Sequence, residues 1–398
     1  MAVEMGDQWE ANVQAFETSE YRARLDGVRA LMSDAGLDAL LVTSEGNLCY
    51  LTGYEEWSPY QQQAVLVTLE DDPYLITRKM ELRNAESTCW LPQDHLVPYA
   101  ESYVGSAERS PWEAIGQFIK GRIGASARIG AELSGTALGV TAYAKLVDAL
   151  GVEELRDATG LVSKCKRVKS ERELAYMTEA AAIVDQAMLA GIDKIAVGTR
   201  QSDVAATIMS ALCSGTESIP GGPPRQLPFM PVGRIANAPH LKWSDEVYSA
   251  GQQTNFEIVA TRRRYCCPLA RTAYLGSPPP RLKQVHDAVL DGWHAAIDAI
   301  RPGVRCSDVA RAFDVAFRPH GIQKDSRIGY SVGLDWIDGG ASLGDNDHSE
   351  IVADMTFHVI VGIWEPEEGY VFSEVVRVTD DGAEPLSNIP RLLFERPA

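Results

Sequence analysis

Two long apolar segments joined by a short polar turn, between residues 254 and 276, constrain the fold more than any other feature. The first segment, 255–261, is rich in β-branched residues, which favour strands. The turn at 262–264 is Arg-Arg-Arg, and the second segment runs on to Gly276. Apolar segments of this length on both sides of a tight turn predict a β-hairpin buried within a sheet.

This hairpin contains one acid and one proline that a buried strand rarely carries. Alternation places Glu257 and Val259 on one face of the first strand, with their neighbours on the other. If that face lines a cleft, Glu257 is a functional carboxylate. The alternative is an exposed strand glutamate, or one paired with an arginine of the turn. Pro268, on the second strand, has no N–H to donate to the ladder.

The rest of the second half predicts long helices and more strands. Ser170 and Glu173 form an S-x-x-E capping box, and apolar residues then recur at intervals of three and four, as in a helix. A second long helix is expected over about 280–300 and a shorter one over 307–317. Further strands are expected at 226–232, 355–363 and 370–379. The prediction for residues 166–398 is therefore an α+β domain with a curved antiparallel sheet.

The first 165 residues alternate between strand-like and helix-like segments. Helical periodicity covers 20–36 and about 137–150. Apolar runs in "LDALLVTS", "QAVLVTLEDDPYLITR" and "RIGAEL" read as strands separated by turns. This pattern predicts a smaller α/β domain over residues 1–165, with helices covering a mixed sheet.

Charge and cysteine content exclude several classes of function. A net charge of −18 argues against general nucleic-acid binding, which needs a basic surface. The seven cysteines are scattered and include no CxxC, so neither a disulfide framework nor a zinc site is expected. No apolar run approaches a membrane span, and the polar start does not resemble a signal peptide. We therefore expect a cytoplasmic protein without membrane or nucleic-acid partners.

An ordered set of short motifs resembles the creatinase and aminopeptidase P-like family. The motifs span about residues 20–390, at spacings typical of that family. The resemblance implies a pita-bread fold in the second half, a creatinase-type N-terminal domain before it, and a homodimer. The motifs are "TSEGNLCYLTGY", "KCKRVKSERELAYM", "ANAPHLKWSD", "ARTAYLG", "RIGYSVG", "MTFHVIVGIW" and "VRVTDDGAEPLS".

Metal-dependent members of this family hold two metal ions through two Asp, one His and two Glu. Proline and isoleucine offer no side-chain ligand at such positions, and tyrosine and serine are poor substitutes for imidazole and carboxylate. The resemblance therefore implies neither a metal nor another cofactor, and it disfavours a conventional metallopeptidase. The five matching positions here are Glu257, Pro268, Tyr330, Ile360 and Ser373, the last with Glu374 beside it.

Within the family, the local matches resemble those of the ectoine hydrolases, which also lack the metal centre. The matches include "YLTGYEEWSPY", "FEIVATRRRY" and "GYSVG". This resemblance implies hydrolysis of a cyclic amidine to an N-acetyl diamino acid, with the glutamate matching Glu257 attacking the ring carbon. A carboxylate in such a site can also act as a general base, so both roles stay open for Glu257.

Three positions and the length of one segment depart from that group, in the region expected to meet substrate. Cys266 replaces a histidine, Val371 a glutamate and Val361 a proline, and the segment after "GYSVG" is shorter. Cys266 is a candidate substrate contact, although a strand cysteine is more often a small core residue. Lost polar contacts change specificity strongly, so the true substrate stays open.

Three further residues are candidates for proton transfer or substrate binding. His240 follows a proline in a loop and could carry protons near neutral pH; the alternative is a surface histidine. His358, in a strand, could hold or protonate a substrate; the alternative is a satisfied core histidine. Tyr330 could offer its hydroxyl to substrate, and the alternative is a structural tyrosine.

The remaining candidates are aromatic or basic. Trp57 and Tyr60 lie in a loop that the resemblance places over the partner subunit's cleft, where aromatic faces could cover a cationic amidine. Ordinary domain packing is the alternative for both. Trp364, after Gly362, is a similar candidate, and Arg327 is a candidate partner for a substrate carboxylate.

The leading hypothesis is a metal-independent hydrolase of a small cyclic amidine or amide, with Glu257 and His240 as catalytic residues. A second hypothesis keeps the enzyme but changes the reaction to a biosynthetic cyclisation, elimination or isomerisation, motivated by Cys266, Val371 and Ile360. The third is a non-catalytic pita-bread module that binds other molecules.

Overall fold

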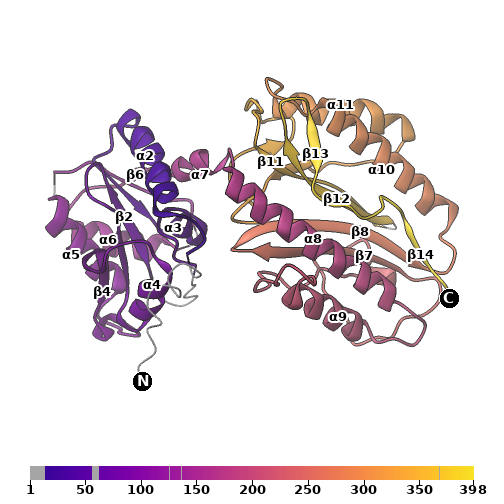
Figure 1. Cartoon of the computed structure of the whole chain (residues 1–398), viewed down its shortest axis with the longest axis horizontal. Helices are drawn as coiled ribbons and strands as arrows, with labels where there is room; N and C mark the ends of the chain where they lie inside the picture. The colour runs from indigo at the N-terminus through magenta and orange to yellow at the C-terminus, as the bar shows by residue number, and fades with distance from the viewer. Residues whose placement is uncertain (1–13, 56–61, 125, 136, 367) are drawn as a thin grey trace. The chain divides into compact units, whose positions relative to one another are not determined.

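The computed structural model describes residues 14–55, 62–124, 126–135, 137–366 and 368–398. The chain divides into two compact units, Met1–Lys166 and Arg167–Ala398, which follow each other in the colour sequence of Figure 1. No helix in the described part of the chain is long and apolar enough to cross a membrane.

The N-terminal unit is a six-stranded sheet with helices, in the strand order β4-β3-β2-β1-β5-β6. Strand β1 runs antiparallel to β2 and parallel to β5, so the sheet is mixed, as predicted. The strands are β1 (Ala39–Val42), β2 (Ala64–Thr68), β3 (Tyr74–Arg78), β4 (Leu96–Tyr99), β5 (Ile129–Ala131) and β6 (Arg156–Asp157). The helices are α2 (Thr18–Asp34), α3 (Glu45–Thr52), α4 (Leu82–Thr88), α5 (Pro111–Ile123), α6 (Val140–Leu150) and α7 (Leu161–Lys166).

The C-terminal unit is built on an eight-stranded sheet, mostly antiparallel, which confirms the α+β prediction. Helix α8 packs on β7 and β8, and α10 packs on β11 and β12 (Figure 1). The helices are α8 (Glu171–Lys194), α9 (Gln201–Ser214), α10 (Pro280–Ala299) and α11 (Cys306–Phe317). The strands are β7 (Gln253–Arg262), β8 (Tyr265–Leu275), β9 (Gly329–Ser331), β10 (Ser342–Leu343), β11 (Thr356–Glu365), β12 (Glu368–Val378), β13 (Ala383–Pro385) and β14 (Phe394–Arg396).

The predicted capping box begins helix α8 and also joins it to the hairpin. The Ser170 side chain accepts a hydrogen bond from the Glu173 amide at 3.2 Å, and the Glu173 carboxylate accepts one from the Ser170 amide at 2.8 Å. The other oxygen of Glu173 accepts from the Tyr265 hydroxyl at 2.6 Å. One acid therefore caps the helix and fixes the first residue of β8 against it.

The predicted hairpin is present as β7 and β8, with Arg262 paired to Tyr265. Arg263 and Arg264 both have positive φ, 47° and 72°, the backbone of a two-residue turn of type I′. This turn matches the right-handed twist of the strands but is costly for residues other than glycine. An ion pair of 2.9 Å between Arg264 and Asp335 helps to hold it.

Pro268 lies in β8 opposite Val259 and on the same face as Ala270. The register between β8 and β12 joins Ala270 to Ser373, so Pro268 lies outside that pairing. A proline is tolerated in a long strand at such a place because, among the described residues, no ladder partner requires its missing N–H.

The predicted strand over 226–232 is wrong. This segment runs beside β7 but contacts it through two isolated bridges, Phe229 to Glu257 and Val232 to Thr254. Pro228 and Pro231 lack the N–H groups that a continuous ladder needs, so the extended segment does not become a strand.

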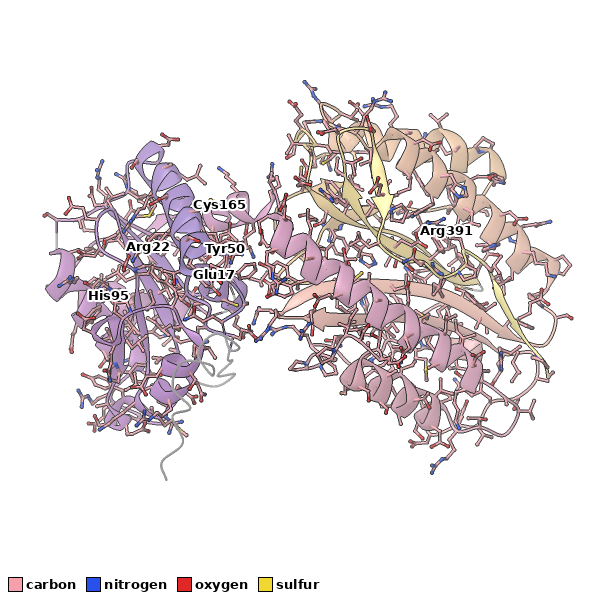
Figure 2. The ribbon with its side chains drawn as sticks, in the orientation of Figure 1. Glu17, Arg22, Tyr50, His95, Cys165 and Arg391 are labelled. Atoms are coloured by element: carbon pink, nitrogen blue, oxygen red, sulfur yellow. The ribbon has the colours of Figure 1, made fainter. Side chains whose placement is uncertain are left out.

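A buried charged cluster braces the face of the sheet opposite Glu257. Arg271 pairs with Glu374 at 2.6 Å, and both side chains are fully buried. Arg391, labelled in Figure 2, contacts the other carboxylate oxygen at 2.9 Å. Arg271 also donates to the Ser373 carbonyl at 2.8 Å, which ties β8 to β12. A buried carboxylate with two guanidinium partners is fully paired, and its loss would leave an uncompensated charge.

Candidate functional site

Glu257 is held in the middle of β7 by backbone contacts on both sides. Its main chain exchanges two hydrogen bonds of 3.0 Å with Phe229, and its register partner on the other side is Ala270. The side chain is 8% exposed. Within the described residues its carboxylate has no hydrogen-bond or ion-pair partner. The alternative of a pairing with the arginines of the turn is therefore not realised.

Burial without a partner changes the protonation of this carboxyl group. Desolvation disfavours the charged form and raises the pKa of Glu257 from its ordinary 4.5 to about 7. A group with this pKa exists in both forms near neutral pH. Its ionised form is poorly solvated, which suits it to attack a substrate atom or to take a proton.

The sheet register brings the positions that match the family's metal ligands onto one face. Glu257 is paired with Ala270, Ala270 with Ser373, and Ser373 with Ile360, a row across β7, β8, β12 and β11. His358 continues this face of β11 and is paired with Tyr330 on β9. The positions that the resemblance matches to metal ligands therefore lie on one face of the sheet, although their chemistry differs from that of a metal centre.

The residues present do not fit a two-metal centre. Of the five matching positions, Glu257 alone carries a carboxylate, and Pro268 and Ile360 carry no donor. Glu374 cannot replace a ligand, because it points to the opposite face and is bound by Arg271 and Arg391. In the ranges that the structure describes, no group of three or more His, Cys, Asp or Glu side chains could hold a metal ion.

Polar side chains next to Glu257 form a chain of hydrogen bonds instead. The Tyr330 hydroxyl accepts from Trp336 Nε1 at 3.0 Å and lies 3.1 Å from His358 Nδ1. His358 Nε2 lies 2.7 Å from the Ser373 hydroxyl. Burial, followed by the charge of Arg327, lowers the pKa of His358 to about 3, so this imidazole is neutral. These contacts are those of a satisfied buried histidine, and a role of His358 toward substrate stays a prediction.

Tyr330 faces both Glu257 and Arg327. Burial raises the pKa of Tyr330 well above its ordinary value, and the charge of Glu257 is the next largest cause. The Arg327 guanidinium lies 4.4 Å from the centre of the Tyr330 ring, a cation–π distance, and its residue is exposed. Arg327 is therefore at the accessible rim of the site.

His240 is brought to the same region through an aromatic neighbour. Its ring centre is 5.1 Å from that of Phe229, whose backbone pairs with Glu257. The ring centre of Phe229 also lies 6.1 Å from that of Trp336. His240 itself is exposed and does not contact the Glu257 carboxylate in the described part of the chain. Its place fits either a proton carrier at the rim or a surface histidine.

Trp364 and Val371 contribute an apolar part of the same face. Trp364 is half-buried on β11, and its indole lies over Gly362; a Cβ on that glycine would be 2.4 Å from the indole nitrogen. Gly362 is paired with Val371, and both flank the row that contains Ile360. A side chain at 362 would therefore clash with the indole, so the glycine is what allows this close contact.

Cys266 and Cys267 are both buried, and they point to opposite faces of β8. Cys266 shares the face of Glu257, and its thiol contacts the Arg264 carbonyl at 3.5 Å. Burial raises the pKa of Cys266 to about 12 and that of Cys267 well above its ordinary value. Neither thiol is a ready nucleophile, because the thiolate is the reactive form.

Trp57 and Tyr60 lie outside the described residues. Two residues that the sequence reasoning did not single out, Trp336 and Phe229, adjoin Tyr330 and Glu257. Trp336 could have been noticed in the sequence as a tryptophan in a short loop, six residues after Tyr330. Phe229 lay within the segment wrongly predicted as an independent strand.

Comparisons with known proteins agree on both units. The family described as metallopeptidase family M24 matches residues 175–380, and the creatinase/prolidase N-terminal domain matches residues 24–168. A Sinorhizobium fredii protein named "uncharacterized hydrolase/peptidase y4tL" is 35% identical over 96% of this chain and 97% of its own. The ectoine hydrolase of Halomonas elongata is 33% identical over 95% of this chain and 98% of its own.

Solved structures resemble the whole chain in fold. The crystal structure of dipeptidase PepE from Mycobacterium ulcerans has a TM-score of 0.81, covering 96% of this chain and 100% of that one. Its sequence is 24% identical, so this likeness concerns the fold alone. It agrees with a pita-bread domain preceded by a creatinase-type domain.

Proposed function

We propose that this chain, which belongs to metallopeptidase family M24, is a hydrolase that opens a small cyclic amidine or amide without a bound metal ion. Its relatives support the class of hydrolases that cleave C–N bonds. The observation that carries the proposal is Glu257, a buried carboxyl group with a pKa of about 7 and without a partner among the described residues, on a face whose matching positions lack metal-binding side chains.

The proposed reaction consumes one water and breaks one C–N bond of the ring. In one route, a Glu257 oxygen bonds to the amidine carbon and the ring nitrogen leaves with the bonding pair and a proton. Water then attacks the adduct, which releases the amide and restores the carboxylate. In the other route, Glu257 takes a proton from water and the water oxygen attacks the carbon directly; the ring nitrogen then leaves with the bonding pair and receives that proton, which restores the carboxylate. Both routes use the unsolvated carboxylate and need no Lewis acid.

The other candidate residues have substrate-binding roles in this proposal. Tyr330 and His358 supply polar groups beside Glu257, and Trp364 supplies an aromatic wall. Arg327, at the rim, would meet a substrate carboxylate, and His240 would carry protons to solvent. Cys266 serves as a small wall residue, since its thiol is buried and protonated.

The proposal includes a cytoplasmic homodimer in which the loop bearing Trp57 and Tyr60 covers the partner's site. The family resemblance supports this arrangement, and aromatic faces suit a cationic amidinium ring. Dimerisation would protect His240 and Arg327, which are exposed in one chain, from solvent.

The test is incubation of the purified protein with ectoine or hydroxyectoine, with the N-acetyl diamino acid product read by mass spectrometry. Halomonas elongata ectoine hydrolase serves as the positive control, and Xaa-Pro dipeptides serve as alternative substrates. We expect product from the cyclic amidines and none from the dipeptides. Dipeptide cleavage without amidine opening would overturn the proposal.

A second reaction on the same site is favoured by two apolar side chains: Ile360, which lies in the row that contains Glu257, and Val371, which flanks that row. A dry wall protects intermediates from water and suits ring closure, elimination or isomerisation. Incubation with the open N-acetyl diamino acid would distinguish this case. A cyclase would convert this compound into the cyclic amidine, whereas the proposed hydrolase would leave it open.

A further inference from the structure

Four side chains form a continuous hydrogen-bonded chain that starts inside the sheet and ends at the accessible side of the site. Ser373 and His358 are fully buried, whereas Tyr330 and Trp336 are half-buried. The linking distances are 2.7 Å from Ser373 to His358, 3.1 Å from His358 to Tyr330, and 3.0 Å from Trp336 to Tyr330. The direction of each hydrogen bond decides what Tyr330 can offer to a ligand.

The available hydrogens allow two arrangements. Each hydroxyl carries one hydrogen, the neutral imidazole carries one, and the indole N–H of Trp336 can only donate. In the outward arrangement, Ser373 donates to His358 Nε2, and His358 Nδ1–H donates to Tyr330. In the inward arrangement, Tyr330 donates to Nδ1, and Nε2–H donates to Ser373.

Burial decides between the two arrangements. Within the described residues, His358 Nε2 is the partner of the Ser373 hydroxyl, and the serine side chain is fully buried. The inward arrangement would leave the Ser373 hydrogen without an acceptor in the core, which is costly. The outward arrangement satisfies it and leaves one hydrogen free on Tyr330, at the half-buried end where a ligand can take it.

The geometry points to Tyr330 as the hydrogen donor to the departing nitrogen of the substrate, with Ser373, His358 and Trp336 as positioning residues. This inference rests on the proposed function for its substrate. When the C–N bond breaks, the nitrogen keeps the electron pair and takes the Tyr330 hydrogen. Two N–H donors, from Trp336 and His358, then hold the phenolate until it regains a proton from the water consumed in the reaction.

Trp336 is suited to this positioning role by its surroundings. The centre of its ring lies 6.1 Å from that of Phe229 and 6.4 Å from that of His358, so two aromatic rings neighbour the indole. Its hydrogen bond also lowers the pKa of Tyr330, against the larger effect of burial. A phenylalanine at 336 would keep an aromatic ring there and remove the N–H, which separates positioning from packing.

The direct test is 15N NMR of the full chain with labelled histidine, which reports which imidazole nitrogen carries the hydrogen. The chain has seven histidines, and the spectrum of His358→Gln assigns the signal of His358. We expect hydrogen on Nδ1 in the wild type, and loss of that preference in Ser373→Ala. Hydrogen on Nε2 of the wild type would overturn the inference. This result needs no turnover, so it stands even if ectoine is not a substrate.

The second readout uses ectoine turnover, if the wild type shows it. We expect Tyr330→Phe to lower kcat at least about a hundred-fold. Trp336→Phe should lower kcat about ten-fold and leave KM nearly unchanged, because the lost donor acts on the phenolate. The control is Trp293→Phe: Trp293 packs on Phe372 beneath the opposite face, and its buried N–H has no partner among the described residues. A kcat of Trp336→Phe equal to that of this control would also reject the inference.

Discussion

If the chain opens ectoine as proposed, we expect Glu257→Gln to lower its turnover by at least about a thousand-fold, the range expected when an acid–base or nucleophilic group is removed. Glutamine has the shape of glutamate, but it neither attacks carbon effectively nor takes a proton. The substitution breaks no described hydrogen bond or ion pair of the carboxylate. The loss should therefore appear in kcat, with a folded protein of wild-type oligomeric state. The measurement is steady-state product formation by mass spectrometry.

The matched control is Glu384→Gln, an exposed glutamate on β13 of the same sheet. It removes the same charge and should retain wild-type turnover. If Glu257→Gln kept more than about a tenth of wild-type kcat, Glu257 would be neither nucleophile nor general base, given the usual size of such contributions.

The same substitution changes stability with pH in a defined direction. The pKa of Glu257 is about 7 in the folded protein, against an ordinary 4.5. A raised carboxyl pKa means that the folded state binds the proton more tightly than the unfolded state does. The contribution is favourable below pH 4.5 and is lost as the pH rises through 7. The full difference is about 3 kcal/mol in the free energy of unfolding.

Glu257→Gln has no such titration, so its stability relative to wild type should rise by about 3 kcal/mol between about pH 4.5 and pH 8. Urea unfolding followed by circular dichroism, at several pH values, measures this difference. Glu384→Gln, which removes an exposed charge, should show little change across the same range. A constant difference between wild type and Glu257→Gln would mean that the carboxyl group is solvated or paired.

The sequence predicted the hairpin and the face on which Glu257 lies, because both depend on local patterns. The alternation of side chains along a strand predicted that Glu257 and Phe256 lie on opposite faces of β7. The register with β8 agrees with this prediction. The capping box at Ser170 and Glu173 depends on four consecutive residues, and it is present as predicted. These features are present in the folded chain because the local sequence preference and the burial of apolar side chains favour the same structure.

The sequence failed where long-range contacts decide the outcome. Residues 226–232 have strand-like composition, but Pro228 and Pro231 limit them to isolated bridges with β7. No hydrophobic periodicity marks Trp336, because its contact is a hydrogen bond to the Tyr330 hydroxyl, six residues away across a loop. The two arginine partners of Glu374 are 103 and 17 residues distant in the chain, and no local pattern predicts them.

Turnover by metal-stripped protein tests the central claim most directly. The protein is treated with a chelator, its residual metal is measured by mass spectrometry, and ectoine opening is then followed with and without added Zn²⁺, Mn²⁺ or Co²⁺. We predict the same kcat in every sample, since Glu257 stands where other family members place metal ligands and its neighbours in the row provide none. Activity that is lost on stripping and restored by a metal ion would contradict this account.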